Sequence, residues 1–118
     1  MKKLITITTV LLITFVGFTF TSCEKEIAEG TPECIINKIS DFEENYACKD
    51  GQVEKYTFQG EVVYVFDPGI KCGADLTSEV VDEECNTLGY LGGIAGNQII
   101  NGEDFYENAV HIGNVWEN

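Results

Sequence analysis

The stretch Gln52–Gly69, QVEKYTFQGEVVYVFDPG, decides how this chain folds. It is rich in β-branched and aromatic residues, which favour strands, and Gln59-Gly60 divides it near its middle. Glycine adopts the positive φ that a two-residue hairpin turn requires, and Asp67-Pro68-Gly69 closes the stretch with turn-forming residues. The sequence therefore predicts an antiparallel hairpin centred on Gln59-Gly60.

Both faces of this hairpin are apolar. A two-residue turn places Tyr56, Phe58, Val63 and Val65 on one face and Val53, Val62, Tyr64 and Phe66 on the other. One face is expected to pack on a helix. The second face is either covered by the glycine-rich C-terminal segment or left open for a partner, in which case Val62, Tyr64 and Phe66 form a binding face.

A helix is predicted just before the hairpin, in CIINKISDFEENYACK (34–49). Its apolar residues recur at helical spacing and share one face: Ile35, Ile39, Phe42 and Tyr46. Thr31 is the expected N-cap, Pro32 suits the first turn, and Glu33 places an acid at the positive end of the helix dipole. Asp50-Gly51 is expected to end the helix.

Shorter strands are predicted after the hairpin, around Glu79–Asp82 and Thr87–Leu91, and they are joined by an acidic turn. Beyond Gly92 the chain is rich in glycine and asparagine, and NAVHIGNVW (108–116) is expected to add an edge strand. The predicted fold class is α+β, with one N-terminal helix packed on an antiparallel meander of about four strands. Residues 31–118 would form this single small domain.

Geometry selects the disulfide pairing among Cys34, Cys48, Cys72 and Cys85. Cys34 and Cys48 lie near opposite ends of the predicted helix, about 21 Å apart at ~1.5 Å per residue, whereas bridged Cα atoms lie within roughly 7 Å. In a meander, Cys72 falls at the sheet end that the helix C-terminus reaches, and Cys85 falls at the other end. The predicted bridges are therefore Cys34–Cys85 and Cys48–Cys72.

The N-terminal part reads as an export signal. Lys2 and Lys3 precede an apolar run, Leu4–Phe20, and Thr21-Ser22 lead directly into Cys23. This pattern resembles the lipobox of bacterial lipoproteins, which implies a signal peptide at 1–22, acylation of Cys23 and a polar tether through residue 30. The alternative is an uncleaved anchor with an ordinary thiol. The chain has five cysteines, an odd number. If Cys23 carries lipid, the other four cysteines can form two disulfides, so the count favours lipidation.

Two or more acyl chains hold a protein firmly on a membrane. The expected location is the bacterial cell envelope, at the outer membrane, facing either the periplasm or the cell surface. From Cys23 onward the chain carries five lysines and twenty acids, a net charge of 5 − 20 = −15. Such a charge disfavours nucleic acid and anionic lipid. It suits a cationic partner or divalent ions, or it serves solubility alone.

Catalytic and cofactor-binding patterns are not found in the sequence, and we expect no enzyme, no cofactor and no resident metal. The one histidine, His111, lies between apolar residues in the expected edge strand. NQIINGEDFYEN (97–108) departs from an EF-hand loop, because Ile99 and Asn108 stand where acidic ligands are required. The acidic turn Asp82-Glu83-Glu84 is expected to be solvated, with calcium binding as the alternative.

Three segments together resemble a family of small uncharacterised bacterial lipoproteins with a single domain of unknown function: PECIINKISDF, VEKYTFQGEVVYVF and CGADLTSEVVDEECNTLGYLGG. The resemblance spans about residues 32–93. Many members of the family carry a double cysteine where Gly73-Ala74 stands here and a further cysteine near Gly89, so the family's bridges do not transfer. The resemblance implies a non-enzymatic envelope lipoprotein and supplies no catalytic residues.

Three functions follow as hypotheses. The first is a binding or accessory module that docks on an envelope protein. The second is a protease inhibitor that presents the loop DPGIKCGAD (67–75), with Lys71 beside a bridged Cys72. The third is an acidic calcium-binding module.

Overall fold

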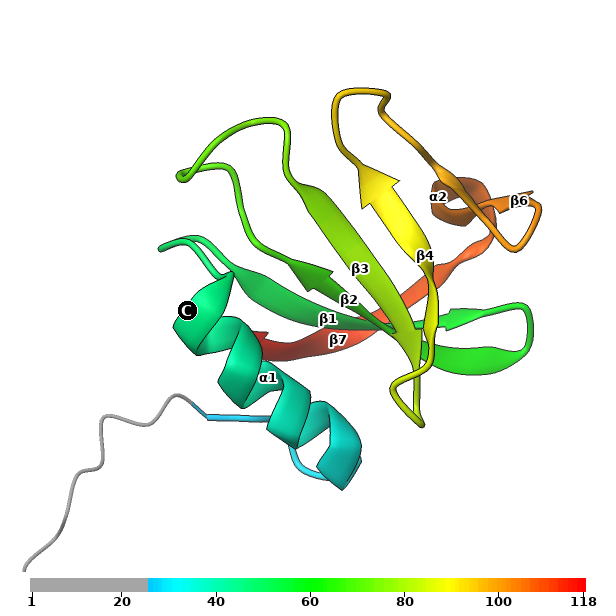
Figure 1. Cartoon of the computed structure of the whole chain (residues 1–118). Coiled ribbons are helices and arrows are strands. Elements are labelled where there is room, and N and C mark those ends of the chain that lie inside the picture. Colours follow the sequence, from blue (N-terminus) through cyan, green and yellow to red (C-terminus); the bar gives the residue numbers. More distant parts are fainter. Residues whose placement is uncertain (1–25) are drawn as a thin grey trace, which may run out of the picture.

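The computed structural model describes residues 26–118, so the expected signal peptide and the lipidation site Cys23 lie outside the described residues. Its centre is a five-stranded antiparallel sheet in the order β4-β3-β2-β1-β7, with helix α1 (Glu33–Asn45) across one face (Figure 1). The five strands are β1 (Gln52–Phe58), β2 (Glu61–Asp67), β3 (Thr77–Asp82), β4 (Thr87–Gly92) and β7 (Val110–Glu117). Between β4 and β7 lie a small strand pair, β5 (Ile99–Ile100) and β6 (Glu103–Asp104), and a short helix, α2 (Phe105–Asn108). The α+β prediction is confirmed, with one more strand in the main sheet than expected.

The predicted hairpin forms the middle of the sheet. Strands β1 and β2 pair from Phe58 opposite Glu61 to Gln52 opposite Asp67. Gln59 and Gly60 both have positive φ, 52° and 77°, as a two-residue type I′ turn requires. The turn therefore sets the register that divides the apolar residues between two faces.

Helix α1 buries the predicted residues Ile35, Ile39 and Phe42. Three predicted details are wrong: the N-cap, the burial of Tyr46, and the end of the helix, which falls at Asn45 and not at Asp50-Gly51. Thr31 does not cap the helix, because its hydroxyl donates to the carbonyl of Ala28 (2.6 Å) and Pro32 occupies the N-cap position. Tyr46 is 65% exposed, because the helix ends at Asn45 and Tyr46 no longer follows its periodicity.

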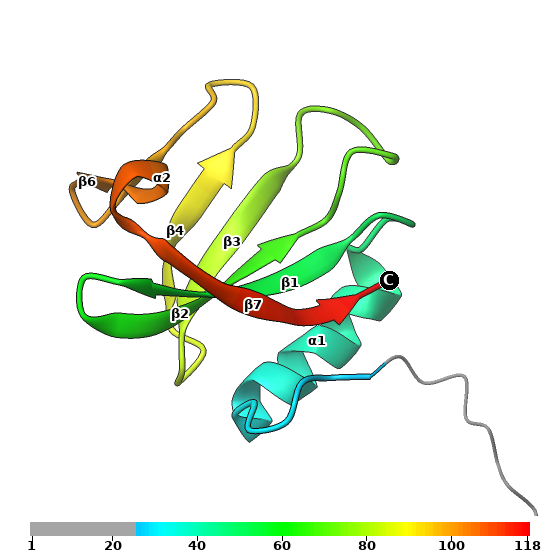
Figure 2. The same ribbon diagram turned by 180° about the vertical axis from the view of Figure 1, so that it is seen from behind.

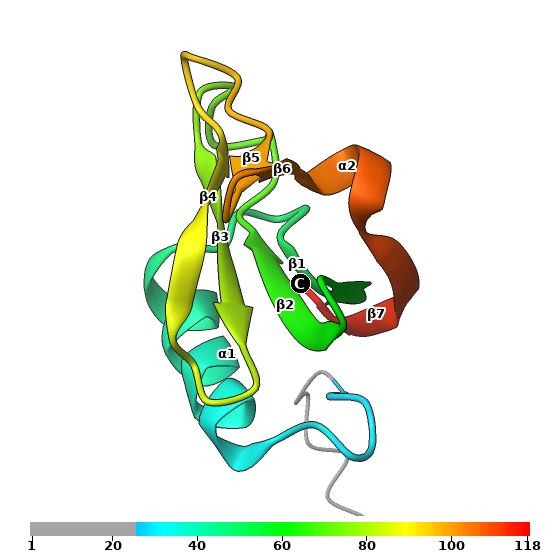
Figure 3. The same cartoon turned by 90° about the vertical axis from the view of Figure 1, so that its right-hand side faces the viewer.

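Both faces of the sheet are covered, as Figure 3 shows with α1 on one side and α2 on the other. Under α1 lies a cluster that contains Val53, Tyr64, Phe66, Val81 and Trp116. On the opposite face, Ile100 and Phe105 from the C-terminal segment cover a second cluster that contains Phe58, Val63, Val65, Val80 and Leu91. The account in which the C-terminal segment covers the second face is therefore the one that the structure supports.

The proposed binding face of the hairpin is wrong. Tyr64 and Phe66 are only 1% and 2% exposed, and Val62 packs partly buried against the same cluster. These residues lie on the face that α1 covers, so they belong to the core and cannot meet a partner.

Two disulfides join the helix end regions to the sheet. Cys34 bonds to Cys85 with 6.1 Å between the Cα atoms, and Cys48 bonds to Cys72 with 5.6 Å between the Cα atoms. These are the pairs that the sequence geometry predicts. They join the N-terminal end of α1 to the β3–β4 turn and the segment after α1 to the loop between β2 and β3.

The expected tether meets the domain earlier than residue 31. Figure 2 shows the first described residues running beside the C-terminal part of β7, where the Ala28 N–H donates to the Val115 carbonyl (3.0 Å). Ile27 packs against the cluster under α1. The predicted boundary at residue 30 is therefore too late, because Ile27 supplies an apolar side chain and Ala28 a backbone donor to the sheet edge.

Candidate functional site

A groove beside α1 is the best candidate binding site in residues 26–118. Its volume is about 450 Å³, and it lies where α1, β3 and β4 meet the loop between β2 and β3. The lining residues are Lys38, Asp41, Phe42, Tyr46, Phe66, Pro68, Leu76, Thr77, Glu79 and Tyr90. The groove thus draws on segments that are far apart in the sequence.

The groove has an apolar floor and an aromatic rim. Phe42 and Phe66 are buried and pack edge to face, with ring centroids 5.3 Å apart. Tyr46, Leu76 and Tyr90 surround them and are 65%, 43% and 51% exposed. A site with a rigid apolar floor and exposed aromatic walls is suited to take up an apolar side chain.

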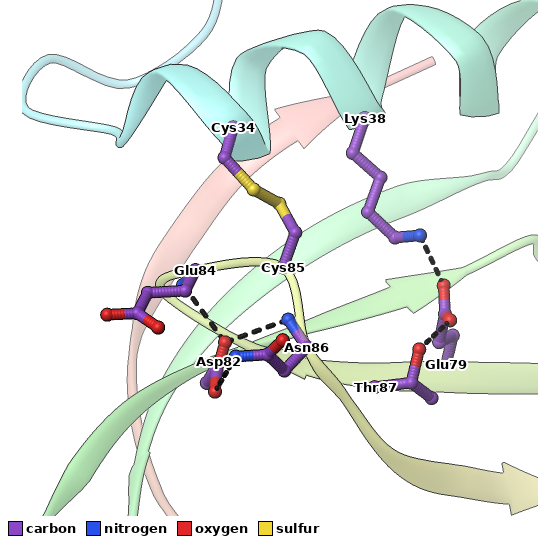
Figure 4. The surroundings of a disulfide bond; sticks show 8 residues. All are labelled: Cys34, Lys38, Glu79, Asp82, Glu84, Cys85, Asn86 and Thr87. Carbon is purple, nitrogen blue, oxygen red and sulfur yellow. Dashed lines mark hydrogen bonds and ion pairs between the residues drawn. A yellow bond between two sulfur atoms is a disulfide. The ribbon is translucent and has the colours of Figure 1, made fainter.

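One ion pair crosses the groove. Lys38 on α1 places its Nζ 2.6 Å from Oε1 of Glu79 on β3, and the same amine lies 5.4 Å from the centre of the Phe66 ring. Thr87 donates its hydroxyl to Oε2 of Glu79 (2.7 Å), as Figure 4 shows. Burial alone would raise the pKa of Glu79, but the hydrogen bonds from Lys38 and Thr87 outweigh it and hold the pKa below its usual value. Glu79 therefore stays ionised and is already well paired.

A second carboxylate in the groove, that of Asp41, makes no ion pair within residues 26–118. Asp41 on α1 accepts a hydrogen bond from the neutral amide of Asn45 (2.8 Å). Its charge is thus available to a ligand in the groove.

The Cys48–Cys72 disulfide holds one end of the groove in shape. The Cys48 N–H donates to the carbonyl of Pro68 (2.9 Å), and the disulfide ties the same residue to the loop that carries Leu76. The groove is therefore largely pre-formed, which limits the entropy that a ligand would lose on ordering it.

The loop proposed for protease inhibition has a tight turn at its centre. Gly73 donates its N–H to the carbonyl of Ile70 (3.1 Å), and the carboxylate of Asp50 accepts from the N–H groups of Ile70 (2.9 Å) and Lys71 (3.1 Å). Proteases bind the residues around a scissile bond in extended form. Lys71 is exposed but lies inside the turn, so the geometry gives the inhibitor hypothesis no support.

The acidic turn proposed for calcium uses its first carboxylate internally. Asp82 accepts from the N–H groups of Glu84 and Asn86 (2.9 Å each) and from the side-chain amide of Asn86 (3.1 Å). In the part of the chain that the structure describes, no three His, Cys, Asp or Glu side chains gather as a metal site would need. The rejected EF-hand stretch contains a second tight turn, with positive φ at Asn101 and Gly102.

His111 lies on β7, away from the groove residues. Its Nε2 is 3.7 Å from Glu54, and its ring meets the Tyr56 ring edge to face at 5.0 Å. Tyr56 donates its hydroxyl to Glu54 (2.8 Å), and burial followed by this hydrogen bond raises the pKa of the phenol. Glu54, Tyr56 and His111 together form a half-exposed polar patch beside an aromatic cluster.

Sequence reasoning missed the groove. Leu76 and Tyr90 stand in a loop and in a short strand, and nothing local marks either as a binding residue. Tyr46 gave no signal either, because its spacing places it on the apolar helix face and only the structure shows that it is exposed.

Fold and groove together define a small disulfide-linked α+β domain with a pre-formed aromatic groove. The chain belongs to the family described as "Domain of unknown function (DUF6970)", whose model matches residues 37–118. No curated protein and no solved structure matches the chain. Among residues 26–118, no helix has the length and apolar character needed to cross a membrane.

Proposed function

We propose that this chain is a lipid-anchored lipoprotein of the bacterial envelope whose domain serves as a non-enzymatic binding module. The observation that carries the proposal is the pairing of the other four cysteines. Cys34 bonds to Cys85 and Cys48 to Cys72, which leaves Cys23 as the one cysteine of five without a partner in the domain. A thiol after an apolar run and Thr21-Ser22 is suited to acylation.

The anchor accounts for the arrangement of the N-terminal part. Each buried methylene contributes about 0.8 kcal/mol, and two or more acyl chains hold a protein firmly. With Ile27 already packed on the domain, only Glu24 to Glu26 separate the lipidated residue from the folded part. The domain would thus sit close to the outer membrane rather than on a long tether.

The groove supports recognition rather than chemistry. Its lining is more apolar than polar, and the carboxylate of Glu79 is held by Lys38 and Thr87. The other carboxylate, Asp41, has no histidine, serine or cysteine beside it among the residues that line the groove. A general base needs a free lone pair directed at a substrate proton. The arrangement is better suited to binding a partner segment.

Lipidation is tested by labelling bacteria that express the full chain with an alkyne fatty acid. The wild-type chain should take up the label and sediment with the outer membrane, and Cys23→Ser should lose the label. Ser40→Ala, an exposed change on α1, serves as the matched control and should behave as wild type. Equal labelling of wild type and Cys23→Ser would rule the proposal out.

A further inference from the structure

We propose that the groove beside α1 binds a basic peptide segment of a partner protein, with an apolar side chain flanked by Lys or Arg. The inference rests on the proposed function in one respect: the partner segment is what the binding module recognises. Four features of the domain favour this occupant: the apolar floor, the carboxylate of Asp41, the exposed rings and the net negative charge.

The apolar part of the segment would fill the floor. The groove of about 450 Å³ lies within the range of roughly 300–1,000 Å³ that is typical of ligand sites. Phe42 and Phe66 form a fixed base, and Leu76 lies at the rim. One large apolar side chain placed here would remove these exposed carbons from water.

The flanking cation follows from what the groove already contains. Lys38 shows the local chemistry, since its amine is held between the Phe66 ring and the carboxylate of Glu79. Asp41 offers the same kind of charge and makes no ion pair in residues 26–118, because the nearby Lys38 on the same helix is paired with Glu79. The exposed rings of Tyr46 and Tyr90 can stack on a guanidinium or ammonium group.

The net charge of the domain indicates which kind of partner the groove can bind. From Cys23 onward the net charge is 5 − 20 = −15, so a second copy, an acidic peptide and an anionic lipid surface would all be repelled. A basic segment would be attracted, and its association should be fast at low salt. Charge complementarity therefore favours a cationic partner over a homodimer.

Recognition would use side chains rather than strand addition. Strand β4 borders the groove at the sheet edge, but the side-chain amide of Asn97 donates to the Tyr90 carbonyl (2.7 Å). Gly92 and Asn97 also exchange backbone hydrogen bonds (2.8 and 3.1 Å). These contacts occupy backbone groups that an added strand would need.

The test is isothermal titration of the full chain in a non-ionic detergent with three synthetic capped peptides: KFKLK, EFELE and KSKSK. KFKLK should bind the protein and not the empty micelle, whereas EFELE and KSKSK should bind at least tenfold more weakly. The affinity for KFKLK should fall steeply toward ~1 M salt, where the screening length is about 3 Å. Equal binding of KFKLK and EFELE, or no binding of KFKLK, would overturn the proposal.

Variants locate the binding site. Tyr90→Ser and Asp41→Asn should each weaken KFKLK binding several-fold. Tyr106→Ser is the matched control, because Tyr106 is 60% exposed on α2, outside the groove, and should leave the affinity unchanged. An equal effect of Tyr90→Ser and Tyr106→Ser would contradict the site.

The same titration with Cys23→Ser separates the two proposals. Peptide binding that persists in this variant places recognition in the domain, whatever the state of Cys23. A chain that is lipidated but does not bind KFKLK would refute the groove proposal and leave the anchor intact.

Discussion

The ring of Phe66 is buried in the core and also forms part of the floor of the groove. It packs edge to face on Phe42 and carries the amine of Lys38 above it, while only 2% of its surface is exposed. We predict that Phe66→Ala lowers the free energy of unfolding by about 3–5 kcal/mol, the usual cost of truncating a buried aromatic residue. Urea unfolding followed by circular dichroism measures this free energy.

As a control, Tyr46→Ser should change the free energy of unfolding by no more than ~0.5 kcal/mol, because Tyr46 is largely exposed. A loss below about 1 kcal/mol for Phe66→Ala would mean that the ring is not core.

The ionisation of Glu79 should make the folding stability of the domain depend on pH. Its pKa in the folded state lies below the ordinary value of 4.5, so the unfolded chain binds the proton more tightly. The stabilisation is therefore fully present above that ordinary pKa and is lost as the pH falls through the lower folded value. We predict that Glu79→Gln melts at a lower temperature than wild type near neutral pH and that the gap narrows below about pH 4. Thermal melts across this range check it, and a constant gap would contradict the role of the charge.

The alternation of apolar residues in the hairpin predicted two apolar faces, but it did not show which face the helix covers or whether the other face is covered at all. Tyr64 and Phe66 share a face with Val53, and that pattern is the same whether a helix or a partner lies on it. The helix packs there because its own apolar residues, Ile35, Ile39 and Phe42, are buried in one cluster with Tyr64 and Phe66. The two disulfides link the N-terminal part of the helix and the segment after it to the loops of the sheet.

At the scale of elements, the β1–β2 turn offers a clean test of backbone conformation. Gly60 has φ +77°, and a Cβ added there would meet nothing within 4 Å, so Gly60→Ala should cost only the strain of positive φ, about 1 kcal/mol. Gly113 on β7 is the matched control, since a Cβ there also meets nothing within 4 Å and its φ is not positive. Gly113→Ala should be neutral or slightly stabilising in the same unfolding experiment. Equal losses at both positions would show that the positive φ of Gly60 carries no particular cost for alanine.

The two disulfides should differ in their contributions. They close segments with sequence separations of 51 and 24 residues, so the chain-entropy model assigns about 4 kcal/mol to Cys34–Cys85 and about 3.5 kcal/mol to Cys48–Cys72. Replacing both cysteines of a pair by serine avoids a free thiol. We predict the larger loss of unfolding free energy for the Cys34/Cys85 double variant, measured by urea titration. A larger loss for the Cys48/Cys72 variant would show that local strain or denatured-state structure outweighs loop length.

Elements with strong local signals were predictable. Gln59-Gly60 set the hairpin, and Ile35, Ile39 and Phe42 set the buried face of α1. The ends of elements were less predictable: Thr31 donates to Ala28 instead of capping the helix, and Ile27 packs on the domain although its segment is mostly polar. Such ends depend on what the chain meets in space, which a local pattern does not contain.

For the whole molecule, the disulfide pairing was accessible from the sequence because helix length excludes Cys34–Cys48 and the expected meander then selects between the two remaining pairings. The groove was not accessible, because Lys38, Glu79 and Tyr90 come together only once α1 crosses β3 and β4. The same assembly accounts for the ion pair that spans the groove in Figure 4. The disulfides of this domain could thus be predicted from the sequence pattern, whereas the groove forms only when the helix packs on the sheet.

The central claim is that Cys23 anchors this domain in the envelope, and the most direct measurement is the intact mass of the protein extracted from bacterial membranes. The account predicts a chain that begins at Cys23 and carries the added mass of its acyl groups. A species that spans Met1 to Asn118 with an unmodified Cys23 thiol would contradict it.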